Sequence, residues 1–409
     1  MTNRKLIKKQ LYLDVIKILK KINKLSERME DVIIIGAGLA GLGCAKRLYE
    51  NKQRFKIITE DIGGRVKTSP DGETNYGAYY MTADCKNIRP YVTKTGRVRF
   101  SHSHLHNEED HYHVFSPKIL KHVPAGLKLI KDLYFFRKHL LKFRRDSLNH
   151  SRQELIEADP LMRKYYHQKA SEYITESGLE DLTKKYLEQF LWASFFIDPR
   201  KVPTALFLGS LQPLLVPSYT FKFNFDKLIK GFKKEIIIDS VKKIKNNGNH
   251  FVLKTKSSKI YQCKKLVIAT PMSITNNLIK PQKIKGGINV SYYHLKGEIR
   301  APYDAKWYNF FSVNETTAIS REPNGTYLYF YGGKNKVKKY FKKYTIIAHN
   351  SWKPALYFLG DEYVNLNPEP NLFLATDHDV PGMEDAFING HYTAKLVLKS
   401  LKVKNKIKP

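Results

Sequence analysis

The sequence DVIIIGAGLAGLGCAKRL, residues 31–48, decides the fold of this chain. It opens with a short β-branched run that is typical of a buried parallel strand. A G-x-G-x-x-G motif made by Gly36, Gly38 and Gly41 comes next, and the residues after it have helical apolar spacing. Gly36 permits a tight turn, Gly38 lets a pyrophosphate approach the backbone, and Gly41 lets the helix pack close to the strand. The phosphates are then expected on the free N–H groups at the start of the helix.

A second apolar run, residues 55–59, follows the helix and ends in Glu60. This carboxylate is placed to accept hydrogen bonds from a ribose hydroxyl, at the distance beyond the glycines that dinucleotide sites require. The strand–helix–strand context therefore favours a dinucleotide site. The alternative is a glycine-rich turn without a ligand.

Gly63-Gly64-Arg65 comes soon after Glu60. With this segment the chain resembles the flavin amine oxidase superfamily, which includes monoamine and polyamine oxidases and phytoene-desaturase-like enzymes. In that family the ribose glutamate precedes a G-G-R segment that serves the FAD phosphates. The spacing between the glutamate and G-G-R is shorter here than in the family, which indicates a divergent branch.

Further segments match the family in the expected order. Residues 75–80 resemble the D-x-G-A/G segment that passes beneath the flavin, with Asn75 where Asp is usual. Residues 236–244 resemble the strand whose backbone near Val241 contacts adenine. Residues 266–271 resemble the V-I-x-A-x-P strand and turn, which contains Thr270.

Residues 375–377 and the segment after them resemble the closing A-G-D/E motif and the flavin-binding helix. The resemblance implies that Asp377 bonds the ribityl or phosphate region, and that the Met383 N–H faces the flavin O2. Thr376 replaces the usual glycine, and we expect it to shift the cofactor slightly. The FAD-binding residues implied are Gly36, Gly38, Leu39, Ala40, Gly41, Glu60, Gly63, Gly64, Arg65, Gly77, Ala78, Val241, Thr270, Asp377 and Met383.

The cofactor is expected to be non-covalent FAD. The family's covalent branch uses a cysteine just before the closing motif, and no cysteine follows Cys263 here. The implied fold class is α/β: a discontinuous Rossmann-type FAD-binding domain with an inserted α+β substrate domain. Its boundaries are a basic N-terminal extension at 1–28, an FAD-binding domain at 29–85, 215–275 and 345–409, and a substrate domain at 86–214 and 276–344.

The composition limits the function classes. The 409 residues include 71 Lys+Arg and 38 Asp+Glu, which gives a net charge of +33, and 42% are hydrophobic, so bulk disorder is excluded. Three cysteines are too few for a disulfide framework and favour a reducing compartment, the cytoplasm. No apolar run is long enough to be a transmembrane segment.

Because the lysines are evenly spread, the positive charge is best interpreted as solvated surface residues. Attraction to an anionic partner or to nucleic acid is the alternative. Residues 1–28 are basic with helical apolar spacing. Either they lie on a membrane surface or direct targeting, or they are an extension without a catalytic role.

The substrate region is rich in aromatic residues, which suits an apolar or cationic substrate. Two residues are catalytic candidates from the resemblance: Lys296, in a strand whose lysine holds a water near flavin N5 in several amine oxidases, and Trp352, before the flavin-facing loop. Their alternatives are a solvated lysine and core packing. Tyr327, Tyr329 and Tyr331 alternate on one strand and either line the pocket or pack across strands.

Five histidines are expected on one hairpin. They are His102, His104, His106, His111 and His113. Their spacing permits zinc, but a hairpin surface merely rich in histidine is favoured, so no metal site is assigned.

The resemblance implies an FAD-dependent oxidoreductase, an amine oxidase that moves hydride from a C–N bond to flavin N5, with oxygen as acceptor giving hydrogen peroxide. The partner is a small-molecule substrate, and no obligate protein partner is evident. The alternatives are a desaturase or porphyrinogen-oxidase-like flavoenzyme and a catalytically degenerate FAD-binding module.

Overall fold

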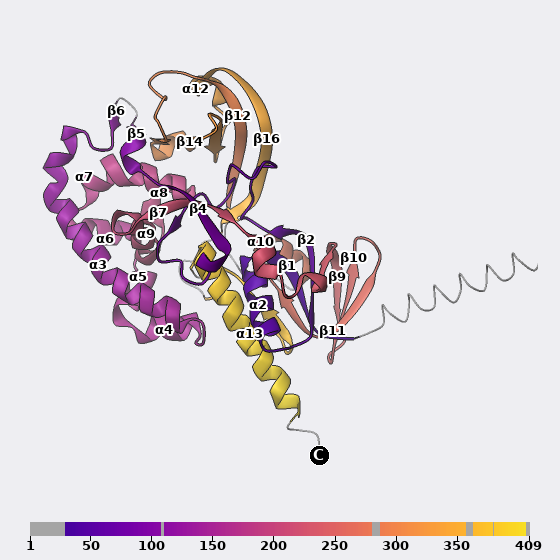
Figure 1. Ribbon diagram of the computed structural model, residues 1–409. Helices are drawn as coiled ribbons and strands as arrows, with labels where there is room; N and C mark the ends of the chain where they lie inside the picture. The colour runs from indigo at the N-terminus through magenta and orange to yellow at the C-terminus, as the bar shows by residue number, and fades with distance from the viewer. Residues whose placement is uncertain (1–28, 108–109, 280–286, 357–362, 379, 406–409) are drawn as a thin grey trace, which may run out of the picture.

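The computed structural model describes residues 29–107, 110–278, 287–356, 363–378 and 380–405, together with Ile279. Within them the chain forms two seven-stranded sheets and a three-stranded sheet. The first seven-stranded sheet, on the right in Figure 1, carries the nucleotide motif. Its strands are β1 (Glu30–Gly38), β2 (Phe55–Gly63), β8 (Ile236–Ile238), β9 (Val241–Asn246), β10 (Phe251–Thr255), β11 (Ile260–Ile268) and β17 (Leu372–Leu374).

Strand β1 lies at the centre of this sheet, parallel to β2 on one side and to β11 on the other. Its apolar run is buried on both faces, because Val32 and Ile34 join one hydrophobic cluster and Ile33 and Ile35 join another. Helices α2 (Leu39–Glu50) and α13 (Met383–Asn405) cover the first of these faces. The two helices are in close contact, because a Cβ on Gly390 would lie 1.9 Å from the Ala40 carbonyl oxygen.

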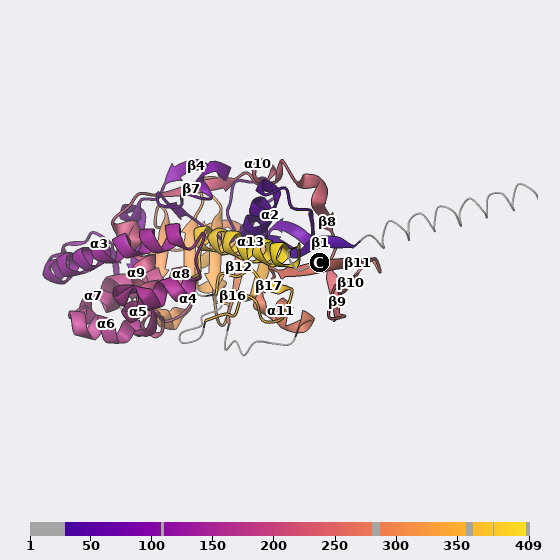
Figure 2. The same ribbon diagram turned by 90° about the horizontal axis from the view of Figure 1, so that it is seen from below.

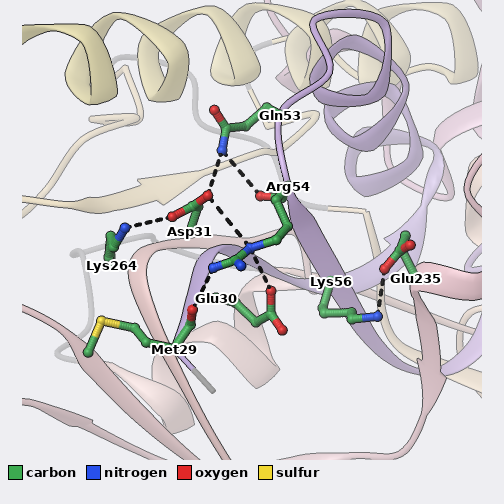
Figure 3. Close-up of polar contacts among 8 residues, drawn as sticks. All are labelled: Met29, Glu30, Asp31, Gln53, Arg54, Lys56, Glu235 and Lys264. Atoms are coloured by element: carbon green, nitrogen blue, oxygen red, sulfur yellow. Dashed lines mark hydrogen bonds and ion pairs between the residues drawn. The ribbon is translucent and has the colours of Figure 1, made fainter. Parts of the chain in front are cut away.

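Charged and polar side chains form a network at the end of the sheet where β1 begins (Figure 3). Arg54 donates to the Met29 carbonyl at 2.7 Å, and Lys264 donates to Asp31 at 2.7 Å. Lys56 of β2 pairs with Glu235 at 2.6 Å, just before β8. The glycine motif is at the opposite end of β1, so this network fixes the sheet without occupying the nucleotide end. The predicted extension at 1–28 lies outside the described residues.

The second seven-stranded sheet has the order β16-β12-β15-β14-β13-β5-β6. Its strands are β5 (Ser103–His106), β6 (His111–His113), β12 (Ile288–Ile299), β13 (Tyr308–Phe311), β14 (Thr317–Arg321), β15 (Tyr327–Tyr331) and β16 (Phe341–Leu356). The predicted histidine hairpin and aromatic strands are therefore present. The predicted boundary at residue 345 falls inside β16, which pairs with β12 along its length.

Helices pack against one face of the second sheet and form the left side of Figure 1. They are α3 (Val123–Asp146), α4 (Arg152–Ala158), α5 (Pro160–His167), α6 (Ala170–Ser177), α7 (Glu180–Leu182), α8 (Glu188–Phe195) and α9 (Thr204–Ser210). A small sheet is made of β3 (Met81–Thr82), β4 (Val92–Arg97) and β7 (Ser218–Phe223). Its strands occur in the chain where the sequence passes from one large sheet to the other. The remaining α-helices among the described residues are the short α10 (Phe225–Ile229), α11 (Met272–Leu278) and α12 (Val337–Tyr340). In these residues no helix combines the length and apolarity needed to cross a bilayer.

Candidate nucleotide and substrate site

The glycine motif forms the turn between β1 and α2. A Cβ on Gly41 would lie 2.0 Å from the Gly36 carbonyl oxygen, so the first turn of the helix rests directly on the end of the strand. A Cβ on Gly38 would meet no atom within 4 Å among the described residues. Gly38 is also the N-cap of α2, and no described side chain caps this helix end. The first N–H groups of α2, which include those of Leu39 and Ala40, therefore have no side-chain cap and could bind an anion that approaches Gly38.

The G-G-R segment lies against this turn. Strand β2 continues without a loop into Gly63, which pairs with Gly38. A Cβ on Gly64 would lie 3.2 Å from Gly38 Cα. The Thr59 hydroxyl accepts from the Ala37 N–H at 3.1 Å, which fixes the two strand ends together. Glu60, next in the chain, is exposed, and its side chain has no hydrogen bond or ion pair with any described residue, so its carboxylate is accessible to a ribose.

Arg65 joins the G-G-R segment to the closing motif. Its Nη2 lies 2.7 and 2.8 Å from the two carboxylate oxygens of Asp377, and its Nη1 donates to the Ala355 carbonyl at 2.8 Å. Burial acts to raise the pKa of Asp377, but the Arg65 guanidinium and His378 outweigh it and hold that pKa below its usual value. The Arg65 guanidinium is thus paired with a carboxylate within the fold.

Two departures from the family motifs have local partners. The Asn75 amide donates to the Phe221 carbonyl at 2.8 Å, a bond that a carboxylate at this position could not donate. The Thr376 hydroxyl accepts from the His378 N–H at 3.0 Å, and its own N–H donates to Asn389. The Thr376 side chain is thus held in a short turn of the chain.

The start of α13 is anchored on both sides of Met383. Glu384 is buried and accepts from the Asn87 N–H, the Asn87 amide and the Ile88 N–H at 2.9, 2.7 and 3.1 Å. Burial raises the pKa of Glu384. Asp385 pairs with Arg144 of α3 at 2.7 Å. These bonds hold the helix start in a fixed place, with the Met383 N–H among its first donors.

The remaining predicted cofactor residues lie around the same strand ends. Thr270 follows β11, and its Cγ2 would be 3.4 Å from a Cβ on Gly36. Val241 begins β9 and is buried, and the nearby Asp239 N–H donates to the Thr59 carbonyl at 2.9 Å. Ala78 packs against the hydrophobic cluster under α2. The sites predicted from distant parts of the sequence are therefore close to the carboxyl ends of β1, β2 and β11, where ligands bind in open α/β sheets.

Trp352 reaches the segment that follows Arg65. A Cβ on Gly77 would lie 1.9 Å from the Arg65 carbonyl oxygen and 3.4 Å from the Trp352 ring. Trp352 also packs on Tyr292, with ring centroids 5.2 Å apart, and Tyr292 on Tyr76 at 5.0 Å. The tryptophan is therefore at the junction of the nucleotide motif and the second sheet.

His294 is a buried residue of this junction that the sequence did not single out. The Tyr76 hydroxyl lies 3.1 Å from its Nδ1, and the Thr326 hydroxyl lies 2.8 Å from its Nε2. Burial lowers the pKa of His294. Lys296, two residues further along β12, is exposed and pairs in register with Thr345. Its catalytic role stays a prediction.

Glu322 is a second residue that sequence reasoning missed. It is 6% exposed, and its Oε1 accepts from the Ser320 hydroxyl at 2.7 Å and the Tyr79 hydroxyl at 3.2 Å. Trp307 Nε1 in turn donates to the Tyr79 hydroxyl at 3.0 Å. Burial raises the pKa of Glu322 to about 6. The Tyr79 hydroxyl thus links a buried carboxylate to the Trp307 ring, and a carboxylate beside aromatic rings can attract a cation.

The three alternating tyrosines of β15 are not part of this junction. Tyr327 and Tyr329 are buried, and Tyr331 packs with them, in a cluster on the other face of the sheet. Leu328 and Phe330 face the cluster that contains Trp352. Of the two interpretations of these tyrosines, packing across strands therefore describes their contacts in the structure.

The predicted histidine hairpin is present, and it places His104 opposite His113 and His106 opposite His111. His102 lies outside it, in the 3-10 turn η2 (Phe100–His102). His106 Nδ1 and His111 Nδ1 are 3.0 Å apart, and burial lowers the pKa of His106 to about 4. No group of three metal-ligating side chains is found among the described residues.

Comparisons with known proteins match this geometry. A family model described as an NAD(P)-binding Rossmann-like domain matches residues 34–95. The structure of wild-type putrescine oxidase bound to putrescine is 11% identical, with a TM-score of 0.62 over 91% of this chain and 99% of that chain. Cyclohexylamine oxidase from Brevibacterium oxydans IH-35A is 14% identical, with a TM-score of 0.60 over 92% and 100%.

No curated protein matches the chain by sequence. The structural matches span nearly the whole chain, including the second sheet and its helices. They confirm the predicted α/β fold class. The chain therefore has the fold of these two amine oxidases, and its residues 34–95 match the model of an NAD(P)-binding Rossmann-like domain.

Proposed function

We propose that the chain is an FAD-dependent oxidoreductase that holds its cofactor non-covalently. The observation that carries this proposal is the turn at Gly38: open space, an uncapped helix start and the G-G-R segment all meet there. The helix N–H groups would bind the pyrophosphate, Glu60 the ribose, and the start of α13 at Met383 the flavin ring. The three cysteines of the chain, Cys44, Cys85 and Cys263, are buried and free, and all lie before the closing motif.

The proposed reaction is oxidation of an amine. FAD supplies the hydride acceptor, at N5. Glu322 and the rings of Tyr79 and Trp307 would attract and orient the cationic form of the substrate. Trp352, which packs close to Gly77 and on Tyr292, would exclude water from the flavin ring. Oxygen as final acceptor, with hydrogen peroxide as product, is part of this proposal, as is the cytoplasm, which suits three unpaired thiols.

Flavin content and anaerobic reduction test the proposal in sequence. Purified protein is expected to be yellow and to release FAD on acid denaturation. Primary, secondary and polyamines are then mixed anaerobically with the holoprotein, and bleaching of the flavin is followed by peroxide detection on re-aeration. A colourless protein that takes up no FAD would refute the cofactor assignment. Reduction only by a carotenoid-like lipid or a porphyrinogen would replace the amine oxidase with a desaturase-like enzyme, and silence toward all of them would indicate a degenerate module.

A further inference from the structure

Helix α3 is apolar on two faces. One face packs into the core of the helical layer, which is the usual arrangement for a surface helix. The buried residues on that face are Leu129, Leu133, Phe136, Leu140 and Phe143. A second apolar face is not needed for packing of the fold.

The second face is exposed to solvent. It begins at Leu120, in the 3-10 turn η3 (Pro117–His122), and continues along α3 at alternating spacings of three and four residues. This spacing places the side chains in one line along the helix surface. The residues, which we call the outer stripe, are Leu120, Val123, Leu127, Ile130 and Tyr134, with exposed fractions of 68, 46, 67, 39 and 58%. Contiguous apolar surface of this kind mostly marks an interaction site.

Helix α3 lies at the rim of the molecule. In Figures 1 and 2 it forms the outer edge of the helical layer, at the end of the molecule away from β9 and β10. The outer stripe is therefore accessible to a large partner that approaches from this side.

The positive charge beside the outer stripe indicates what kind of partner would bind there. Helix α3 carries seven Lys or Arg and two Asp, and Lys128, Lys131 and Lys138 are exposed. The whole chain has a net charge of +33. A second copy would bring like charges together along the stripe, which costs free energy. An anionic surface with an apolar interior pairs with the lysines and buries the stripe.

We propose that the outer stripe docks on a bilayer surface that contains anionic lipid headgroups. The helix would lie in the plane of the interface, with Leu127 and Ile130 in the acyl boundary and the lysines at headgroup level. This mode of binding needs no membrane-crossing helix. It is independent of the proposed oxidase activity, because none of these residues belongs to the nucleotide or substrate site.

The test is sedimentation of the full chain with vesicles of phosphatidylcholine, with and without phosphatidylglycerol. We expect binding to the anionic vesicles, and at least a tenfold loss of binding in the double variant Leu127→Glu, Ile130→Glu. The matched control is Ile346→Glu, Ile347→Glu on β16, where both residues are 44–50% exposed and apolar but outside α3. If the glutamate variant does not fold, the pair Leu127→Ser, Ile130→Ser replaces it.

The lysines are tested separately. The variant Lys128→Glu, Lys131→Glu should lose binding to anionic vesicles, whereas Lys242→Glu, Lys243→Glu on β9 should keep most of it. Three outcomes would overturn the proposal: no vesicle binding by the wild type, equal binding by the stripe variant, which would assign binding to other basic segments, or a self-associated wild type that the stripe variant disperses without any vesicle binding.

Discussion

Substitutions at two glycines of one motif should have opposite effects, and this separates the cofactor site from the fold. Gly38 has φ −71° and ψ 175°, which any residue can adopt, and a Cβ there meets no described atom within 4 Å. Gly38→Ala should therefore leave the flavin-free protein as stable as wild type or about 0.4–1 kcal/mol more stable, because the unfolded chain loses freedom. Gly41→Ala places a Cβ 2.0 Å from a backbone oxygen and should cost about 1–3 kcal/mol or more.

Added FAD should stabilise the wild type more than the Gly38 variants. At a concentration of about 100 Kd it stabilises wild type by about 2.7 kcal/mol. Gly38→Ala, and more strongly Gly38→Val, should lose most of this gain, because the new side chain occupies the space where the pyrophosphate approaches the helix. Denaturant unfolding of the deflavinated proteins, repeated with FAD, measures both quantities. The reasoning fails if Gly38→Val binds FAD as wild type does, or if its flavin-free form is as destabilised as Gly41→Ala.

Three further predictions concern carboxylates. Glu60→Ala should weaken FAD binding by about 1.5–3 kcal/mol, measured by flavin fluorescence titration, with little change in unfolding of the flavin-free protein. Asp377→Asn should leave Arg65 without its charge partner and lower the stability at neutral pH by about 1–3 kcal/mol. The difference in stability between wild type and variant should shrink as pH falls through the depressed pKa of Asp377, and an unchanged difference in acid would contradict this. Burial raises the pKa of Glu322 to about 6, so the folded state binds the proton of this carboxyl more tightly than the unfolded state does. The stability of wild type should therefore fall by about 2 kcal/mol relative to Glu322→Gln as pH rises from about 4.5 through 6. The same variant should raise KM for amines, and parallel profiles of stability against pH would show that the carboxylate is not buried as described.

The nucleotide half of the candidate site could be placed from the sequence because its signals are local. The strand, the glycine turn and the helix lie within residues 31–48, and each glycine has a geometric reason that can be stated from the sequence. The histidine hairpin was predictable for the same reason, since a short turn sets its register. The alternating histidines of the sequence extend back to His102, but the pairing of the two strands does not, so His102 was wrongly expected in the strand.

The substrate half was not predictable, because its contacts join distant segments. Tyr76 meets His294 across 218 residues, and Tyr79 meets Glu322 across 243. Nothing near Glu322 in the sequence distinguishes it from a turn residue. The β15 tyrosines show the remaining difficulty: alternation separates the two faces of a strand, but both faces of this sheet are covered by apolar clusters, so the pattern cannot tell which one meets the cofactor domain.

The departures from the family motifs do not weaken the case for a cofactor site. Asn75 donates a hydrogen bond to a strand carbonyl, which gives the amide a structural reason to stand where Asp is usual. The Thr376 hydroxyl is engaged by the His378 N–H, so the extra side chain is held within its own turn. The short spacing after Glu60 lets β2 run straight into Gly63 and places Gly64 against Gly38. Each change is accommodated by a bond or a contact within the fold, while the open helix start at Gly38 is kept, and this start is the feature a pyrophosphate requires.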